Sequence, residues 1–396
     1  MKRNGWGYCW SAGPVVALFA TLCLADAHAE EFQYQVHGFA SQAFAKSWGN
    51  NYVGESLDGS LDFYELGLNA TAGGGPITVS GQVLYRRFGE IDREGARLDF
   101  AFADYRFLSG VDANAGIRLG RVKNPYGFYN DSRDIVFTRP GILLPSSVYF
   151  EGSGVRSLLF SSDGGQLYGG WNVQDHYLSA IVSRALDFEA SEDQERSLFG
   201  GSFPGEIEID GLTVARLMDE WAGGTWRAAL TYTTAELALD PAPGVPFFGS
   251  FDADLYIASL AHNGERYSVT AEYLLTRFKS RFGGVSERSS SDGIYVQADY
   301  QFASAWTGML RYDLTFSDRN DRDGREYAAE EPGNDRHDRF ARDFTVGLKW
   351  LPDEHWGVWA EQHFTQGSAN APGLENQNRT IEPDGKLFLL MVGYHF

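Results

Sequence analysis

The last twelve residues, Gly385 to Phe396, constrain the fold of this chain more than any other stretch. Apolar side chains recur there at every second position, which is the period of a β-strand. They are Phe388, Leu390, Val392, Tyr394 and Phe396. A strand with one apolar face and a terminal aromatic ring suits a lipid bilayer, where the ring lies at the headgroup level. The alternative is a buried edge strand of a soluble β-sandwich.

The first 29 residues have the pattern of a secretory signal peptide. Two basic residues near the start precede an apolar core over 14–24 and a cleavage site at Ala27-His28-Ala29. We therefore expect a signal peptide over 1–29 and one mature domain over 30–396. Both cysteines of the chain fall in the signal, so no disulfide is expected in the mature protein.

Composition favours β structure and argues against one class of partner. Aromatic residues make up 15% of the chain, which also has 46 glycines, as expected for many strands joined by tight turns. The net charge of −20 argues against nucleic acid as a partner. After the signal, the longest apolar run is Leu387–Val392. It is far shorter than the ~20 residues of a transmembrane helix, but barrel strands need no such run.

Segments of about 10 residues with alternating faces follow one another from Phe32 onward, and this length suits a tilted membrane strand. In the clearest segments, apolar residues occupy one face and polar residues occupy most of the other. These segments are 77–85, 226–233, 267–275, 294–301, 306–316 and 344–350.

The predicted connections between these strands are of two kinds. The short ones are 73–76, 222–224, 263–265, 303–305 and 352–355, and the long polar ones are 46–58, 188–205, 237–250, 279–291, 317–339 and 366–384. Short turns at one rim and long loops at the other are typical of an outer-membrane barrel. We predict an all-β, transmembrane antiparallel β-barrel of about 16 strands. An even count requires residues 155–162 to belong to a loop, and 18 strands is the alternative.

The third long loop is expected over 122–164, between a strand near 114–121 and the next strand near Gly165. It is rich in Pro, Arg, Asp and aromatic residues, as in the run from Gly120 to Tyr129. This loop and the C-terminal strand resemble those of the 16-stranded trimeric porins of Gram-negative bacteria. The resemblance implies a loop that folds inward and narrows the barrel, and a homotrimer with one pore per chain. It also implies a location in the cell outer membrane, with its lipid and lipopolysaccharide as partners.

Charged residues in and beside this loop are the candidates for the narrowest point of the pore. They are Arg118, Arg121, Lys123, Asp131, Arg133, Asp134 and Arg139. Opposed charges at a constriction would set a transverse field that orients solutes, so an Arg133→Glu substitution is expected to change ion selectivity. Alternation places Arg121 on the lipid side, which makes it a weaker candidate than Arg118. The alternative is that these residues only bond the loop to itself.

The polar faces of the predicted strands would line a water-filled lumen. Besides Arg118, the residues expected there are Arg227, Glu272, Asp299, Arg311, Asp313, Lys349 and Glu361. Leu387, Leu389 and Met391 depart from this pattern, because they are apolar on the same inward face. Either the inward loop or a subunit contact would have to cover them.

We predict a porin through which small hydrophilic solutes and ions diffuse passively. No enzyme, metal or cofactor motif is found: Gly200-Gly201-Ser202-Phe203-Pro204 breaks the G-x-S-x-G pattern, and Arg319 stands at the first ligand position of a calcium-like loop. The Arg-bearing loop favours anions, whereas the net charge favours cations at the mouth. The alternatives are a solute-specific, weakly anion-selective channel, an outer-membrane enzyme and a soluble all-β binding module.

Overall fold

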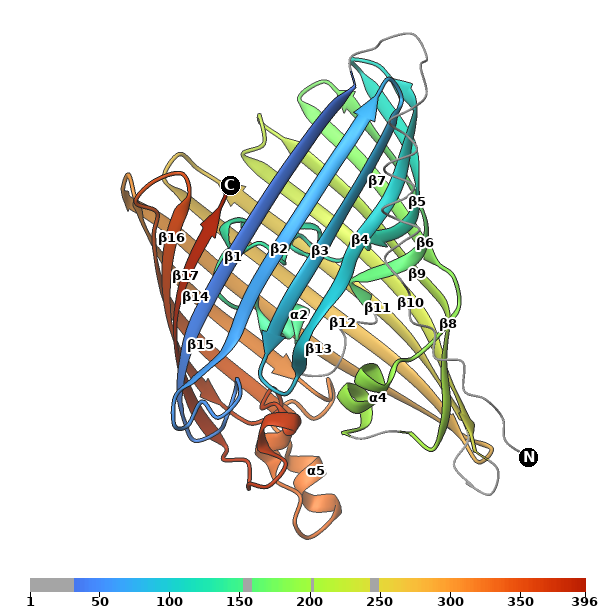
Figure 1. Cartoon of the computed structure of the whole chain (residues 1–396). Helices are drawn as coiled ribbons and strands as arrows, with labels where there is room; N and C mark the ends of the chain where they lie inside the picture. Colours follow the sequence, from blue (N-terminus) through green and yellow to red (C-terminus); the bar gives the residue numbers. More distant parts are fainter. Residues whose placement is uncertain (1–31, 152–158, 201–202, 243–248) are drawn as a thin grey trace, which may run out of the picture.

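The computed structural model describes residues 32–396 apart from 152–158, 201–202 and 243–248. The described part forms one continuous sheet (Figure 1). Its segments are β1 (Gln33–Trp48), β2 (Ser60–Gly74), β3 (Ile77–Phe88), β4 (Asp92–Ser109), β5 (Ala113–Lys123), β6 (Ser161–Val173), β7 (His176–Ala185), β8 (Phe188–Glu189), β9 (Gly205–Trp221), β10 (Trp226–Pro241), β11 (Gly249–Asn263), β12 (Tyr267–Phe282), β13 (Val285–Ala303), β14 (Trp306–Phe316), β15 (Phe340–Trp350), β16 (Trp356–Gln366) and β17 (Asp384–His395).

The sheet closes into an antiparallel barrel of 16 strands. Each strand pairs with its neighbours along the chain, and β1 pairs with both β2 and β17. The short β8 is not a separate strand of the wall, because β7 and β8 both pair with β9. The predicted antiparallel barrel of 16 strands is therefore confirmed, and the alternative count of 18 is wrong.

Short helices lie in the connections between strands. They are η1 (Asn130–Ser132), η2 (Val136–Thr138), α2 (Ser146–Tyr149), α4 (Glu192–Phe199), α5 (Arg325–Glu330), η3 (Arg336–Arg339) and η4 (Gly373–Asn376). Within the described residues, no helix is long and apolar enough to span a bilayer. The predicted signal peptide over 1–29 lies outside the described residues.

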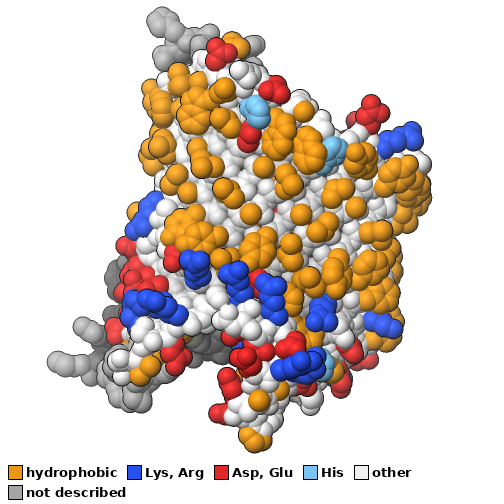
Figure 2. Space-filling model, turned by 180° about the vertical axis from the view of Figure 1, so that it is seen from behind, with side chains coloured by type: hydrophobic (Ala, Val, Ile, Leu, Met, Phe, Trp, Pro, Cys, Tyr) orange, Lys and Arg blue, Asp and Glu red, His pale blue; other side chains and the backbone are white. Residues whose placement is uncertain are grey.

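The two faces of the wall differ in chemistry, as alternation predicts. In β17, Leu390 and Val392 are 39% and 41% exposed, whereas the neighbouring Leu389 and Met391 are fully buried. Figure 2 shows the apolar side chains as a broad band across the outer surface in this view, with Lys and Arg gathered along its lower edge. The outer face therefore suits lipid, and the inner face packs against other parts of the chain.

The C-terminal residue completes the seam of the barrel. Gly38 in β1 and Phe396 exchange two main-chain hydrogen bonds of 3.0 and 3.2 Å. A Cβ atom on Gly38 would lie only 2.5 Å from the Phe396 ring, so glycine leaves room for the ring there. Tyr394 lies beside this ring, with 6.5 Å between ring centroids.

Two predicted connections are corrected by the structure. Residues 279–291 are not a long loop, because β12 and β13 continue to a hairpin turn at Gly283–Gly284, where both glycines have positive φ. Paired strands satisfy their own backbone groups in water as well as in lipid, so polar composition alone does not end a strand. The third loop is shorter than 122–164, because β5 extends to Lys123 and β6 begins at Ser161.

Three connections are joined beyond the seam, at the rim that carries the long loops. The Asn51 N–H donates to the Asn376 side chain at 3.0 Å, and the Asn376 amide donates back to the Asn51 carbonyl at 2.8 Å. The buried Glu375 carboxylate accepts hydrogen bonds from the N–H groups of Glu90 and Ile91. These bonds tie the connection before β17 to those that follow β1 and β3.

Deleting Phe396 should weaken the seam. The deletion removes two main-chain hydrogen bonds and should lower the free energy of unfolding by about 1–3 kcal/mol. Urea unfolding in detergent, followed by tryptophan fluorescence, measures this change. Phe302→Ala removes another exposed ring away from the seam and is the control. Equal stability of the two variants would contradict the assigned role of Phe396.

Acidification should tighten the contact made by Glu375. Burial, together with the nearby Glu90 charge, raises the pKa of Glu375 to about 7, against about 4.3 in the unfolded chain. The loop contact is therefore most favourable below about pH 4 and weakens as pH rises through 7. Hydrogen exchange of residues 367–383, corrected for intrinsic rates, should show less protection at pH 8 than at pH 5. Glu375→Gln should abolish this difference, and an unchanged difference would refute the assignment.

Candidate functional site in the barrel interior

The connection between β5 and β6 makes its main contacts with the inward faces of other strands. Glu272 in β12 is the first anchor and is 1% exposed. Its carboxylate accepts hydrogen bonds from the Phe128 N–H at 2.9 Å and from the Tyr149 hydroxyl at 2.7 Å. It also accepts from Ser259 and Tyr295 on the adjacent strands, both at 2.6 Å. One carboxylate thus bonds two parts of the loop to three strands of the wall.

Two further acids bind the backbone of the same loop. Asp313 in β14 accepts from the Ser147 N–H at 3.3 Å, and Glu361 in β16 accepts from the N–H groups of Ile142 and Leu143. All three acids were expected to line the lumen, and all three do lie on inward faces. They are buried, however, so they hold the loop and do not present free charge to solvent. The reason is that an irregular segment must find partners for its backbone N–H groups outside itself.

Basic residues on inward faces bind the loop carbonyls. Arg311 donates to the Leu143 carbonyl at 2.9 Å, and Arg216 in β9 donates to the Gly127 carbonyl at 2.8 Å. Arg216 also forms an ion pair of 2.7 Å with Asp131. Asp131 is more exposed than the other loop acids that form ion pairs. Arg311 was expected on the inward face, whereas Arg216 was missed.

A buried ion cluster fixes the other side of the loop. Its centre is Arg86 in β3, which is 1% exposed. Arg86 pairs with Glu65 in β2 at 3.0 Å, with Glu151 of the loop at 3.2 Å, and with Asp92 in β4. Arginine suits this place because its five N–H donors can serve several carboxylates at once.

Two predicted constriction residues belong to this ion cluster. Arg139 pairs with Glu65 at 2.7 Å, and Arg133 pairs with Glu151 and lies 3.9 Å from the centre of the Phe160 ring. Arg133 and Arg139 are 1% and 5% exposed, so they are not free charges facing the pore. An Arg133→Glu variant would therefore break the loop's attachment, which makes it a poor test of ion selectivity.

The remaining constriction candidates are placed as follows. Lys123 lies 2.9 Å from Asp99 and also pairs with Asp134, which is 2% exposed. Arg118 faces inward, pairs with Asp104 at 2.9 Å and stacks on the Tyr168 ring.

Arg121 lies at the margin between the outer face of the wall and the loop. It pairs with Asp163, which is 67% exposed, and the neighbouring Leu119 is 58% exposed while Val122 is buried. Arg121 nevertheless lines a small cavity together with Lys123, Arg133 and Asp134, so it lies at the edge of the loop.

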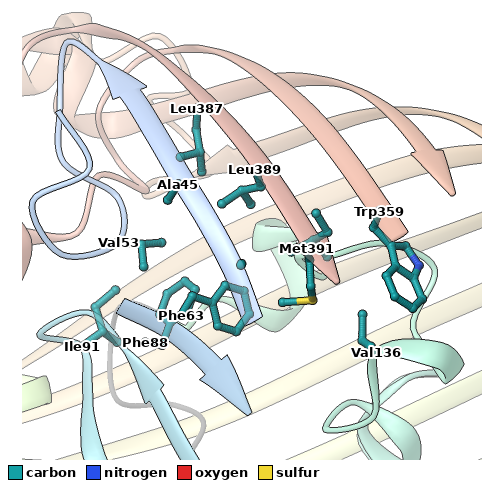
Figure 3. Close-up of a cluster of buried hydrophobic side chains, with 12 residues drawn as sticks. Ala45, Val53, Phe63, Phe88, Ile91, Val136, Trp359, Leu387, Leu389 and Met391 are labelled. Atoms are coloured by element: carbon teal, nitrogen blue, oxygen red, sulfur yellow. The ribbon is translucent and has the colours of Figure 1, made fainter. Parts of the chain in front are cut away.

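An apolar cluster explains the three residues that departed from the inward polar pattern (Figure 3). Leu387, Leu389 and Met391 are at most 3% exposed. They pack in one buried group with Val136 and Ile142 of the loop, and with Trp359 and Phe63 from neighbouring strands. The loop therefore covers them, which was one of the two explanations left open by the sequence.

Burial also keeps the loop tyrosines neutral. Desolvation, with the nearby Glu272 charge as the second cause, raises the pKa of Tyr149 well above its ordinary value. Burial likewise raises the pKa of Tyr126 and Tyr129. A neutral hydroxyl can donate to a carboxylate, which is the role of Tyr149 beside Glu272.

The sequence analysis missed Arg86 and Glu65, although strand alternation could have identified Arg86. Alternation in the segment 77–85 puts Thr78, Ser80 and Gln82 on the inward face, and the same alternation carried past Tyr85 adds Arg86. A longer predicted strand would therefore have identified it. Nothing in the sequence indicated which acids it would bind.

Replacing Arg86 should destabilise the loop and the wall together. Arg86→Met leaves the buried Glu65 with fewer partners and should cost about 3 kcal/mol of unfolding free energy. Urea unfolding and protease cleavage within 124–160 measure the effect. Arg93→Met is the control, because Arg93 is 56% exposed and its change should cost less than about 0.5 kcal/mol. Similar losses in both variants would show that the buried ion cluster does not stabilise the loop.

Comparison with known proteins gives structural but no sequence relatives. No protein-family model and no curated protein matches the chain. The fold is similar to the outer membrane channel DcaP of Acinetobacter baumannii, with a TM-score of 0.57 and 13% identity over 94% of this chain and 100% of that one. The anion-selective porin from Comamonas acidovorans aligns with a TM-score of 0.55 and 13% identity, over 92% and 100% of the two chains. OmpF of Salmonella typhi, in complex with daunomycin, aligns with 0.57 and 13%, over 92% and 97%. The chain therefore has the barrel fold of outer-membrane porins and channels.

Proposed function

We propose that this protein is an outer-membrane porin through which small hydrophilic solutes and ions diffuse passively. The observation that carries the proposal is the contrast between the two faces of a closed wall. The outer face is apolar, and the inner face carries charged residues from strands on every side, such as Arg118, Arg227 and Lys349. A 16-stranded barrel is wide enough to hold water, and solved barrels of similar shape are outer-membrane channels.

The connection over 124–160 is proposed to narrow this pore. It is hydrogen-bonded to inward residues of β9, β12, β14 and β16. The buried ion cluster also links it to β2 and β3. Anchors on so many strands would hold the loop across the lumen. Solutes would then pass only beside it, which sets a size limit by the diameter left open.

The assembly and surroundings are proposed from the same resemblance. A homotrimer in the outer membrane, in contact with lipid and lipopolysaccharide, is supported by solved neighbours that include a trimer form of Vibrio cholerae OmpT. The basic edge of the apolar band (Figure 2) would face the anionic headgroup region. Chemical cross-linking of the folded, detergent-extracted protein should yield a three-chain product, and protein denatured before cross-linking should not yield it.

Conductance in a planar bilayer tests the proposed pore. Purified folded protein should insert in steps of constant conductance, and a salt gradient should give a reversal potential toward the anion side. We expect anion preference because Arg227 and Lys349 remain beside open space, whereas several acids are bonded to the loop. Folded protein that inserts but passes no current would reject the porin function. A cation-selective current would keep the pore and reject the expected preference.

A further inference from the structure

A cavity of about 430 Å³ remains inside the barrel on the short-turn side of the loop. It extends from the turn at 264–266 to the loop segments around Phe128 and Pro140. This volume is in the range of small-molecule binding sites. The cavity is part of the proposed pore. A solute site in it therefore rests on the proposed function, and it would identify the class of solute that the pore prefers.

Three cations reach this cavity from separate places. Arg227 enters from β10, Lys349 from β15 and Arg266 from the turn between β11 and β12. Lys349 and Arg266 have no carboxylate within 4.0 Å among the described residues. The nearest carboxylate oxygen to Arg227 is the Glu220 oxygen at 3.8 Å, and the buried Arg227 Nε has no hydrogen-bond partner within the described part of the chain. Arg227 is thus only loosely paired, and cations without close ion partners that face one cavity favour an anion between them.

The acids of the cavity do not cancel this preference. Asp299 lines the wall and attracts Lys349, but it also accepts hydrogen bonds from Gln297 at 3.0 Å and from Ser268 at 3.4 Å, which share its charge. Glu265 lies at the turn and is exposed to solvent. Glu272 and Glu361, which were also expected to line the lumen, are hydrogen-bonded to the loop and do not line this cavity.

Aromatic rings supply the second part of the site. Phe128, Tyr129 and Phe137 of the loop line the cavity beside Arg139. The Arg227 guanidinium lies 4.9 Å from the centre of the Phe128 ring, so the ring holds this cation in place and offers an apolar surface next to it. A ligand that has both an anionic group and a flat apolar body would use both features.

We propose that this cavity is a binding site for small organic anions, in particular carboxylates with a planar apolar body. The carboxylate would lie between Arg227 and Lys349, and the apolar body would lie against Phe128. Such a site would slow and select solutes in passage, which turns an open pore into one with a preferred class of solute.

The test uses 4-fluorobenzoate and the folded full-length barrel in detergent. Binding is followed by the line width of the fluorine resonance, which requires no ion current. Lys349→Gln and Arg227→Gln should each weaken binding about tenfold, since each removes a charged hydrogen-bond donor. Lys386→Gln is the matched control, because Lys386 lies exposed on the outward face of β17 and should leave binding unchanged. The cation 4-fluorobenzylammonium should bind far more weakly.

The outcomes separate the site from the pore. Equal 4-fluorobenzoate binding by the wild type, Lys349→Gln and Arg227→Gln would overturn the proposal, as would equal binding of the fluorinated cation. Binding that weakens in both variants, in a protein that passes no current in a bilayer, would support the site and reject the porin function. In a conducting protein, 4-fluorobenzoate should also reduce the chloride current, with a half-blocking concentration about tenfold higher in Lys349→Gln.

Discussion

Every backbone N–H and C=O group of a strand needs a hydrogen-bond partner, and this constraint governs the barrel wall. The structure meets it by closing the ladder: β1 lies between β2 and β17, and the last residue bonds to Gly38. A sheet with no open edge must put one face of every strand toward the outside and the other toward a shared interior. Closure of the sheet therefore separates an apolar outer face from a charged interior.

The interior then creates a second requirement, because charged side chains away from water need partners. The connection over 124–160 supplies many of them. Its backbone N–H groups bond to Glu272, Asp313 and Glu361, and its carbonyls bond to Arg216 and Arg311. Wall and loop depend on each other, since each would leave buried polar groups unsatisfied without the other. The cations that the loop does not use are those that face the remaining cavity.

Alternation in the sequence predicted side-chain direction well and side-chain partners poorly. It placed Glu272, Asp313 and Glu361 inward, where they are buried against the loop. It did not show that these three acids hold a loop, because that depends on the path of a segment 144 to 219 residues earlier in the chain. The strand ends on both sides of the hairpin at Gly283–Gly284 are polar where they extend beyond the apolar outer band. They were therefore predicted to form a long loop.

The strand period and the inward or outward direction of most strand residues could be predicted from the sequence, because they follow from local backbone geometry. The even strand count follows the pattern of bacterial single-chain barrels. Which charges are bound and which have no close ion partner became visible only in the folded chain. Arg133 and Arg139 became part of a buried ion cluster, whereas Arg227 and Lys349 kept open space beside them. The physical reason is that the free charge of a residue depends on what lies within a few ångströms of it, and these neighbours come from distant parts of the chain.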